Sequence, residues 1–146
     1  KIENDQFASN NTLHLSTYLT DLLSTYTEII EMRNIHLEKK FNFDPVLIID
    51  DDLAYALFSN LITNAIKHNN EEGFIAIKVN KMEVVFTNSG DPTEGDTHQM
   101  FDRFTKAAES NSPGLGLAIV KKICDHYKID VAYSYANSRH KVTLSI

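Results

Sequence analysis

Apolar residues in the first part of the chain recur every three or four positions, which is the spacing of a helix that buries one face. They are Leu19, Leu22, Leu23, Tyr26, Ile29 and Ile30. Ser16 or Thr17 can cap this helix through a side-chain hydroxyl, and the short alternating run at 13–15 predicts a strand before it. We therefore expect a strand followed by an amphipathic helix.

The middle of the chain continues with strand and helix patterns. Residues 35–42 and 46–49 predict two strands separated by Pro45. The acidic run 50–52 follows, and carboxylates there suit both the cap and the positive dipole end of a helix. This second helix is predicted to extend to about Asn69.

Alternating apolar and polar residues in the second half predict two β-hairpins. The first covers residues 75–86 with a short turn at 80–81, and the second joins strands at 129–135 and 142–146. A third long helix is predicted between them, over 115–127. This order of elements favours an α+β two-layer sandwich, in which about three helices cover one face of a mixed sheet.

The composition is that of a folded domain. A chain of 146 residues that is 42% hydrophobic and 23% charged has room for one domain of ordinary size. Its single cysteine, Cys124, excludes an intrachain disulfide and indicates a reducing compartment. The net charge of -6 disfavours nucleic acid or a membrane surface as a partner, and an apolar run such as 46–49 is far too short for a membrane span. Any anion must therefore bind at a local site.

Three polar residues share one edge of the predicted second helix. At 100° per residue, Asn60, Asn64 and Lys67 fall within an arc of about 60°. Carboxamide oxygens are hard neutral ligands that suit magnesium, and a lysine beside them would neutralise phosphate charge. A solvated polar face is an equally good interpretation of these three residues alone.

Two glycines stand at the start of the predicted third helix, in the run SPGLGLA at 112–118. Without Cβ atoms the backbone can approach a ligand closely, and the free N–H groups of the first helical turn form an anion site. Phosphate is the ligand that this arrangement favours, although glycine at a helix start often serves geometry alone. The run TNSG at 87–90 is a weaker signal, because such residues commonly make a turn.

Four segments follow one another with a characteristic spacing: LFSNLITNAIKH at 57–68, NSG at 88–90, MFDRF at 100–104 and GLGLAIVK at 114–121. Together they resemble the N, G1, F and G2 boxes of the ATP-binding domain of sensor histidine kinases.

The resemblance to this domain covers about residues 13–146. It implies a two-layer sandwich that binds ATP between helices under a mobile lid, which would span 91–112. Residues 1–12 resemble the tail of the family's preceding dimerisation helix or a linker, and 13–146 would be the catalytic domain.

The resemblance assigns roles to individual residues. Asn64 matches the magnesium ligand, while Asn60 and Lys67 match polar positions beside the phosphates, which would make them the catalytic pair. His68 lies where the family often has an aromatic residue beside the adenine, and Lys106 lies where a basic residue often approaches the γ-phosphate. The segment that wraps the phosphates is matched by Gly114, Leu115, Gly116 and Leu117.

The G1 segment departs from the family pattern. The family usually begins it with an aspartate that accepts a hydrogen bond from the adenine amino group, whereas this chain has Asn88. An amide oxygen still accepts, but without charge assistance. Gly90 matches the first glycine of the box, and Asp91 and Pro92 stand where a second glycine is expected. Asn88 is a better acceptor candidate than Asp91, which lies three residues further along.

Asn60 also bears on the choice between phosphoryl transfer and hydrolysis. Related ATPases of the gyrase, mismatch-repair and heat-shock chaperone type usually carry a glutamate one helical turn before the metal-binding asparagine, as the base that activates water. A neutral amide cannot take that proton near neutral pH, whereas transfer to an imidazole needs no strong base. The sequence therefore favours an ATP-dependent histidine kinase that uses ATP and Mg²⁺.

No histidine of this chain resembles a phosphoacceptor. Acceptor histidines of the family usually precede an acidic residue, and none of the six histidines does so. They are His14, His36, His68, His98, His126 and His140. We therefore expect the cytoplasmic catalytic domain of a longer, membrane-anchored bacterial sensor in a two-component system, with no direct membrane contact by this domain.

The expected partners are ATP, the dimerisation and phosphoacceptor domain of the same full-length protein, and a downstream response regulator. Two alternatives remain open: a serine kinase of the anti-sigma type on the same fold, and a degenerate nucleotide-binding module without catalysis.

Overall fold

The computed structural model describes residues 10–92 and 116–146. Their helices and strands are β1 (Asn10–His14), α2 (Leu15–Ser24), α3 (Thr27–Met32), β2 (His36–Phe41), β3 (Val46–Asp50), α4 (Asp51–Lys67), β4 (Phe74–Val79), β5 (Glu83–Ser89), α6 (Gly116–His126), β6 (Asp130–Ala136) and β7 (Arg139–Ser145). Residues 93–112 of the expected lid and residues 1–9 of the expected N-terminal segment lie outside the described residues.

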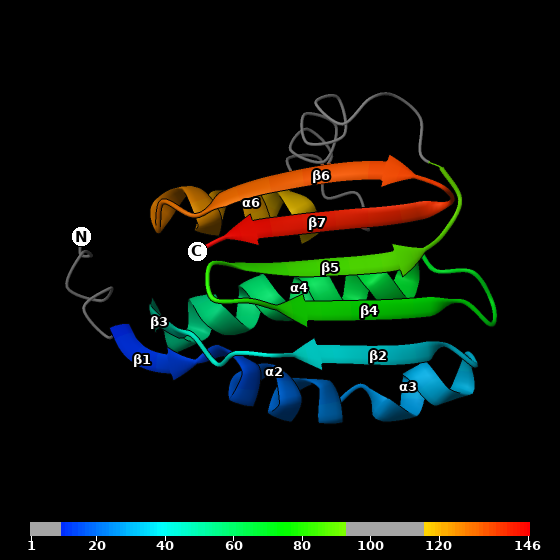
Figure 1. Ribbon diagram of the computed structural model, residues 1–146, viewed down its shortest axis with the longest axis horizontal. Coiled ribbons are helices and arrows are strands. Elements are labelled where there is room, and N and C mark those ends of the chain that lie inside the picture. The colour runs from blue at the N-terminus through cyan, green and yellow to red at the C-terminus, as the bar shows by residue number, and fades with distance from the viewer. Residues whose placement is uncertain (1–9, 93–115) are drawn as a thin grey trace.

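The main sheet has five strands in the order β2-β4-β5-β7-β6 (Figure 1). β2 and β4 are parallel, and the other neighbouring pairs are antiparallel. A parallel pair needs a long crossover connection, and α4 lies in the segment that makes it. β1 and β3 form a separate antiparallel pair. The sheet is therefore mixed, as predicted.

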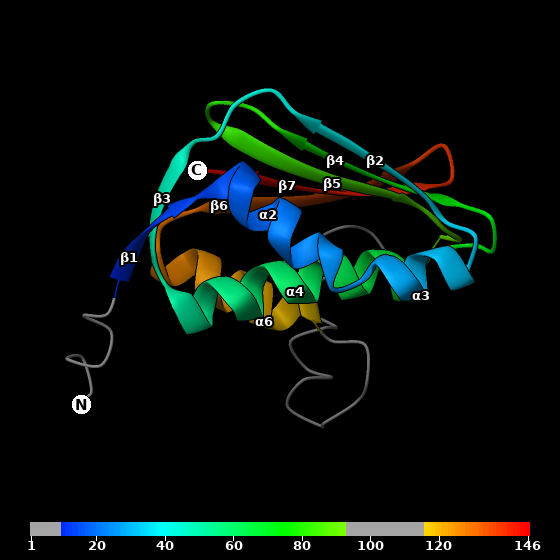
Figure 2. The same cartoon turned by 90° about the horizontal axis from the view of Figure 1, so that it is seen from below.

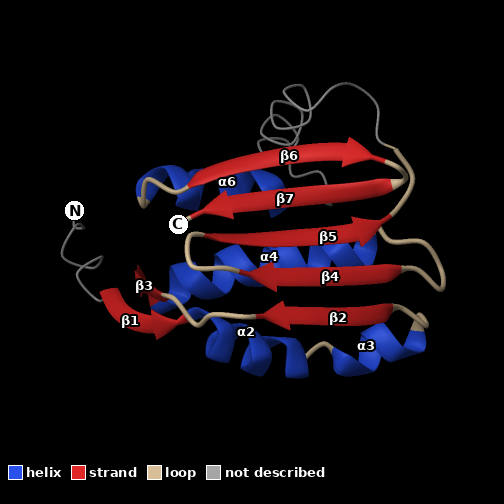
Figure 3. Ribbon diagram, in the orientation of Figure 1, coloured by secondary structure: helices blue, strands red, loops and turns tan. Residues whose placement is uncertain are grey.

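The described helices α2, α3, α4 and α6 lie on one face of this sheet, as the view in Figure 2 shows. In Figure 3, α4 and α6 are seen in blue behind the central red strands. The predicted two-layer α+β sandwich is confirmed. No helix in the described ranges is both long enough and apolar enough to span a bilayer.

The core lies between the two layers. Alternate residues of the central strands point to the helices and are buried: Ile75, Ile77, Val79, Val84, Phe86, Val142 and Leu144. Phe58 of α4 is fully buried, and its ring lies 6.0 Å from that of Tyr18 and 6.5 Å from that of Phe86. This contact fixes α4 to α2 and to β5 together, and burial of such a ring contributes about 1.5–3 kcal/mol.

The start of α4 agrees with the sequence prediction. The Asp50 carboxylate accepts hydrogen bonds from the backbone N–H groups of Asp52 at 2.9 Å and Leu53 at 3.1 Å. These are the donors that have no partner within the helix itself. The cap therefore fixes where α4 begins.

The predicted first helix is two helices, α2 and α3, interrupted at Thr25 and Tyr26. Its predicted cap is also wrong. Ser16 and Thr17 lie inside α2, and the carboxylate of Asp44 accepts from the Ser16 N–H and from the Thr17 hydroxyl, both at 2.7 Å. The hydrogen bond from Thr17 is the main cause that lowers the pKa of Asp44. The cap therefore comes from a distant loop.

Candidate active site

One pocket opens between α4, α6 and the sheet. It is lined by Leu61, Asn64, Ala65, His68, Phe86, Asn88, Leu117, Tyr133, His140 and Val142. Four of these, Asn64, His68, Asn88 and Leu117, are residues that the sequence singled out, from three segments far apart in the chain. The structure therefore brings the N, G1 and G2 segments to one place.

Asn64 contributes a polar group at the edge of this pocket. Its side-chain nitrogen is buried and has no hydrogen-bond partner among the described residues. A buried amide without a partner costs about 1–3 kcal/mol, so such a group at a pocket indicates a place for a ligand. The NH₂ group of Asn64 is therefore not used by the described part of the fold.

Asn60 and Lys67 share a helix edge with Asn64 but do not line the pocket. The Asn60 amide donates to the Ala56 carbonyl oxygen one turn earlier, at 2.5 Å. Lys67 is exposed in the last turn of α4. Asn60 and Lys67 therefore lie along one side of α4, outside the pocket lining.

The donor set at this site fits magnesium. Within the described ranges, no three His, Cys, Asp or Glu side chains gather as a metal site. Magnesium needs no such cluster, because it keeps several waters and takes one or two protein ligands plus substrate phosphates. The carboxamide oxygen of Asn64, at the edge of the pocket, would be one such ligand.

Asn88 lies on the inward side of β5 and is 8% exposed. Its side-chain nitrogen donates to the backbone carbonyl of Ser89 at 2.8 Å. This bond uses the donor side of the amide and leaves the oxygen as the available acceptor. The side chain can thus meet an amino group of a base, which is the role expected for this position.

Gly90 is not a lining residue of the pocket, but it holds two of its walls together. A Cβ at position 90 would overlap the His68 carbonyl oxygen and lie 2.9 Å from the His140 ring. Its own N–H donates to the Ser138 carbonyl at 3.1 Å, and its carbonyl accepts from the Tyr135 hydroxyl at 3.0 Å. The glycine therefore permits close packing between the ends of β5 and α4.

Two histidines of the pocket have lowered pKa values. Burial is the main cause for both His68 and His140, and the charge of Lys67 lowers the pKa of His68 further. The ring of His68 is partly covered although the residue as a whole is exposed. The lowered pKa favours the neutral form of both imidazoles, which line the pocket.

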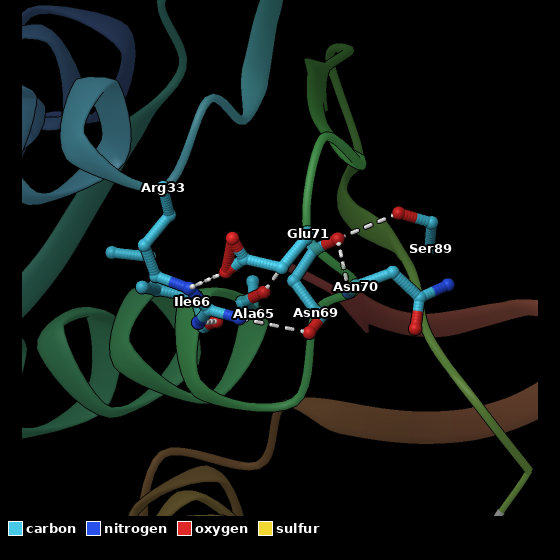
Figure 4. A network of polar contacts seen from close by, with 7 residues as sticks. All are labelled: Arg33, Ala65, Ile66, Asn69, Asn70, Glu71 and Ser89. Carbon is cyan, nitrogen blue, oxygen red and sulfur yellow. Dashed lines mark hydrogen bonds and ion pairs between the residues drawn. The ribbon is translucent and has the colours of Figure 1, made fainter.

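The C-terminal end of α4 is held by a polar network that the sequence did not reveal (Figure 4). Arg33 donates to the carbonyl oxygens of Ile66 and Asn69, the latter at 3.0 Å. Its guanidinium also lies 3.6 Å from the Glu71 carboxylate. A cation at this end of the helix satisfies carbonyls that lack partners and complements the helix dipole.

Asn69 extends this network to the sheet. Its side-chain nitrogen donates to the carbonyls of Ala65 at 3.1 Å and Phe74 at 2.9 Å, and its oxygen accepts from the Ser89 hydroxyl at 2.6 Å. Ser89 in turn accepts from the Phe74 N–H at 2.9 Å. The network therefore ties the end of α4 to β4 and to the G1 segment beside Asn88.

The structure does not describe every predicted site residue. Lys106, Gly114 and Leu115 lie outside the described residues, as does the segment 100–104. Gly116 is the first residue of α6, and Leu117, which is 5% exposed, lines the pocket.

Tyr133 and His140 are pocket residues that the sequence interpretation missed. Tyr133 pairs with the buried Val142 across the β6–β7 ladder, and His140 lies two residues before Val142 on β7, so both point to the helix side of the sheet. The signal in the sequence was the alternation of buried residues along β7, which continues from Leu144 and Val142 back to His140.

Comparison with known proteins agrees with this geometry. Residues 49–146 match the family model described as histidine kinase-, DNA gyrase B-, and HSP90-like ATPase. The sensor histidine protein kinase HK06 of Streptococcus pneumoniae serotype 2 is 26% identical over 140 residues, which are 92% of this chain and 31% of HK06. The heme sensor protein HssS of Staphylococcus epidermidis (strain ATCC 12228) is 31% identical over 119 residues, 78% of this chain and 26% of HssS. The chain thus spans less than a third of these relatives.

Solved structures show the same fold. The nucleotide-free catalytic domain of histidine kinase ThkA superposes with a TM-score of 0.81 at 22% identity, over 94% of this chain and 96% of that one. A mycobacterial sensor histidine kinase, MprB, gives a TM-score of 0.72 at 20% identity, over 93% of this chain and 97% of that one. The resemblance to catalytic ATP-binding domains of sensor histidine kinases is confirmed, and the chain belongs to the histidine kinase-, DNA gyrase B-, and HSP90-like ATPase family.

Proposed function

We propose that this chain binds Mg-ATP in the pocket between α4, α6 and the sheet and transfers the γ-phosphoryl group to a histidine on a separate dimerisation domain. One observation carries the proposal: the fold brings Asn64, His68, Asn88 and Leu117 into one pocket from three separate segments. Each of these segments is a weak signal alone. A chance turn or a solvated helix face would not place them together.

The base side of the site is formed by apolar walls and one acceptor. Apolar surface is supplied by Phe86, Leu117 and Val142. Asn88 supplies its amide oxygen as an acceptor, because its NH₂ group already donates to the Ser89 carbonyl. Binding pockets for flat ligands commonly combine apolar walls with few polar groups in this way. An amino group on the base would donate to the Asn88 oxygen.

The phosphate side of the site follows the polar edge of α4. When bound, Mg²⁺ would neutralise phosphate charge and help to order an in-line transfer. Asn64 would be its protein ligand, and Lys67 would place a positive charge near the phosphates. The resemblance adds Lys106, Gly114, Leu115 and Gly116 to this side.

Asn60 supports transfer over hydrolysis. Its amide is bonded to the helix at Ala56 and carries no group that takes a proton from water. Positioning and electrostatic stabilisation therefore remain as the contributions of the chain, which is sufficient for phosphoryl transfer to a nucleophilic imidazole.

The relatives support the proposed partners and location. One solved structure that shares this fold is histidine kinase ThkA in complex with the response regulator TrrA, with a TM-score of 0.73 at 20% identity over 94% of this chain and 41% of that one. We extend this to our chain as the cytoplasmic catalytic domain of a membrane-anchored sensor. Its partners would be its own dimerisation domain and a downstream response regulator.

The proposal is tested first by Mg-ATP binding. A ligand at a hundredfold excess over its Kd stabilises the fold by about 2.7 kcal/mol, which thermal melts resolve readily. Asn64→Ala should abolish the extra stabilisation that magnesium gives over ATP alone, whereas Asn70→Ala, outside the pocket, should retain it. Melts that do not respond to Mg-ATP would contradict the proposal.

The second test follows the phosphoryl group. With labelled ATP and the dimerisation domain supplied, label should appear on a histidine of that domain as an acid-labile, base-stable adduct, and Lys67→Ala should slow its appearance. Label on a serine of a partner protein would instead indicate a serine kinase of the anti-sigma type. Binding without any transfer would indicate a degenerate module.

A further inference from the structure

His140 is a buried histidine with both ring nitrogens engaged. It is 7% exposed, its Nε2 lies 2.8 Å from the backbone oxygen of Asp91, and its Nδ1 lies 2.5 Å from the Tyr133 hydroxyl. It also faces Asn88 directly across the β5–β7 ladder. Both residues line the pocket, so the proposed base reader and this histidine form adjacent parts of one wall.

The two contacts determine the tautomer of the ring. A backbone carbonyl can only accept a hydrogen bond, so Nε2 of His140 must carry the proton that it donates to Asp91. In the neutral ring Nδ1 is then an acceptor, and the Tyr133 hydroxyl donates to it. The neutral Nε2–H form therefore satisfies both partners at once.

Among the described residues, the ring of His140 is surrounded by the acidic residue Asp91 and by aromatic groups. From β6, the rings of Tyr133 and Tyr135 lie 5.8 Å and 4.7 Å away. Asp91 follows β5, and His68 follows α4. Burial lowers the pKa of His140, and the hydrogen bond to Asp91 and the charge of Asp91 oppose that shift.

Two cations flank His140 on its own strand but face away from it. Arg139 and Lys141 line the hollow on the opposite face of the sheet, together with Thr87 of β5. They therefore do not share the pocket with the imidazole.

We propose that His140 is a positioning residue of the base pocket. A nucleoside binds when the imidazole of His140 is neutral, carries its proton on Nε2 and bridges Asp91 and Tyr133. This inference rests on the proposed function, since it assigns the base to the same pocket. In this form the ring presents an uncharged aromatic face beside Asn88. It also ties the exit of β5, through Asp91, to β6 and β7.

Protonation of His140 would oppose binding for two reasons. The cationic ring carries a proton on Nδ1, so the Tyr133 hydroxyl must turn from donor to acceptor. A base that fills the pocket also removes water from the ring, which raises the cost of the charge. By linkage, a bound base lowers the pKa of His140, and acidification weakens binding.

The test is a titration of the whole chain with adenosine at a series of pH values, followed by NMR. Adenosine is preferred over ATP because it carries no phosphate that titrates in the same range as a histidine, between about pH 5 and 8. If adenosine binds only when the His140 ring is neutral, its affinity one pH unit below the midpoint of the His140 titration should be about tenfold lower than the constant affinity at high pH. Affinity that is constant with pH, or that rises on acidification, would overturn the proposal.

Variants separate His140 from the other histidines. His140→Gln keeps a neutral donor for Asp91, so it should bind adenosine at high pH and lose the pH dependence. His36→Gln, at an exposed position on β2, should retain the full dependence. Because His68 also lines the pocket, the dependence must persist in His68→Gln, and its loss there would overturn the assignment to His140.

Tyr133→Phe tests the hydrogen bond itself. Without the hydroxyl, Nδ1 of His140 loses its hydrogen-bond partner in both protonation states, so the midpoint of the pH dependence should move. An unchanged midpoint would overturn the proposed bridge, as would a ¹⁵N spectrum that places the His140 proton on Nδ1 in the neutral state. Absence of adenosine binding at every pH would overturn the base assignment of the proposed function as well, whereas pH-independent binding would overturn this proposal alone.

Discussion

Gly90 packs directly against the backbone of His68, so that a β-carbon at position 90 would overlap the His68 carbonyl oxygen. The contact joins the exit of β5 to the end of α4, which carry Asn88 and Asn64. No side chain larger than hydrogen fits unless one of the two backbones moves. The relative position of these two pocket walls therefore depends on this residue.

Gly90→Ala should lower the free energy of unfolding by about 1–3 kcal/mol, because an added methyl group in a packed site forces a backbone shift. The same shift should weaken Mg-ATP binding by separating Asn88 from α4. Denaturant melts and an ATP titration measure the two effects. An unchanged midpoint of unfolding together with unchanged affinity would contradict the close packing.

Arg33→Lys should destabilise the chain although it conserves the charge. The guanidinium of Arg33 donates to two carbonyls, of Ile66 and Asn69, and a lysine ammonium cannot span both with the same geometry. We expect a loss of about 1–2 kcal/mol in denaturant melts. Glu71→Gln is the matched control, because this carboxylate is 75% exposed and its ion pair should contribute less than about 0.5 kcal/mol. An equal effect of both changes would contradict the role of Arg33 as a helix cap.

Asn88→Asp should have opposite effects on stability and on base selectivity. The carboxylate cannot donate to the Ser89 carbonyl, so the free chain should lose about 1 kcal/mol of stability. A charged acceptor should at the same time favour an amino group over a carbonyl on the base. The ratio of ATP to GTP affinity should therefore rise by about fivefold, or roughly 1 kcal/mol. An unchanged ratio would mean that this residue does not contact the base.

The features that the sequence predicted correctly depend on neighbours in the chain. The cap of α4 uses Asp50 and the N–H groups two and three residues later, and the hairpins follow from alternation over a few residues. The cap of α2 failed as a prediction because its donor groups meet Asp44, 28 residues from Ser16. A local pattern contains no information about where that loop returns.

The same reasoning explains why His140 was missed. Asn137 and Ser138 both have positive φ, 55° and 62°, which is the conformation of a two-residue hairpin turn. Such a turn pairs Ala136 with Arg139 and extends β7 three residues before the predicted start at position 142. With this register, alternation places His140 inward. Asn69 had no comparable signal, because its partners come from α4, β4 and β5 together.

The last prediction concerns Asn60 and the fate of bound ATP. The unmodified chain should hydrolyse ATP negligibly and should not phosphorylate itself, because Asn60 is not a base and no histidine in the sequence resembles an acceptor. Asn60→Glu introduces a carboxylate one helical turn before Asn64, where a base could reach water near the γ-phosphate. A general base contributes about 10²–10⁴-fold when well placed, so even an imperfect one should raise hydrolysis by at least about tenfold.

Asn60→Gln is the control for this change, since it has the length of glutamate without its basicity. Both variants lengthen the side chain and so disturb the short bond from the Asn60 amide to Ala56, which glutamate, having no donor, cannot make. Release of inorganic phosphate, measured at saturating Mg-ATP, should increase for Asn60→Glu alone. An equal increase in Asn60→Gln would show that loosening of the helix, and not a base, allows hydrolysis. Rapid hydrolysis by the unmodified chain would contradict the role of Asn60 in favouring transfer, because water would then be activated by some other group.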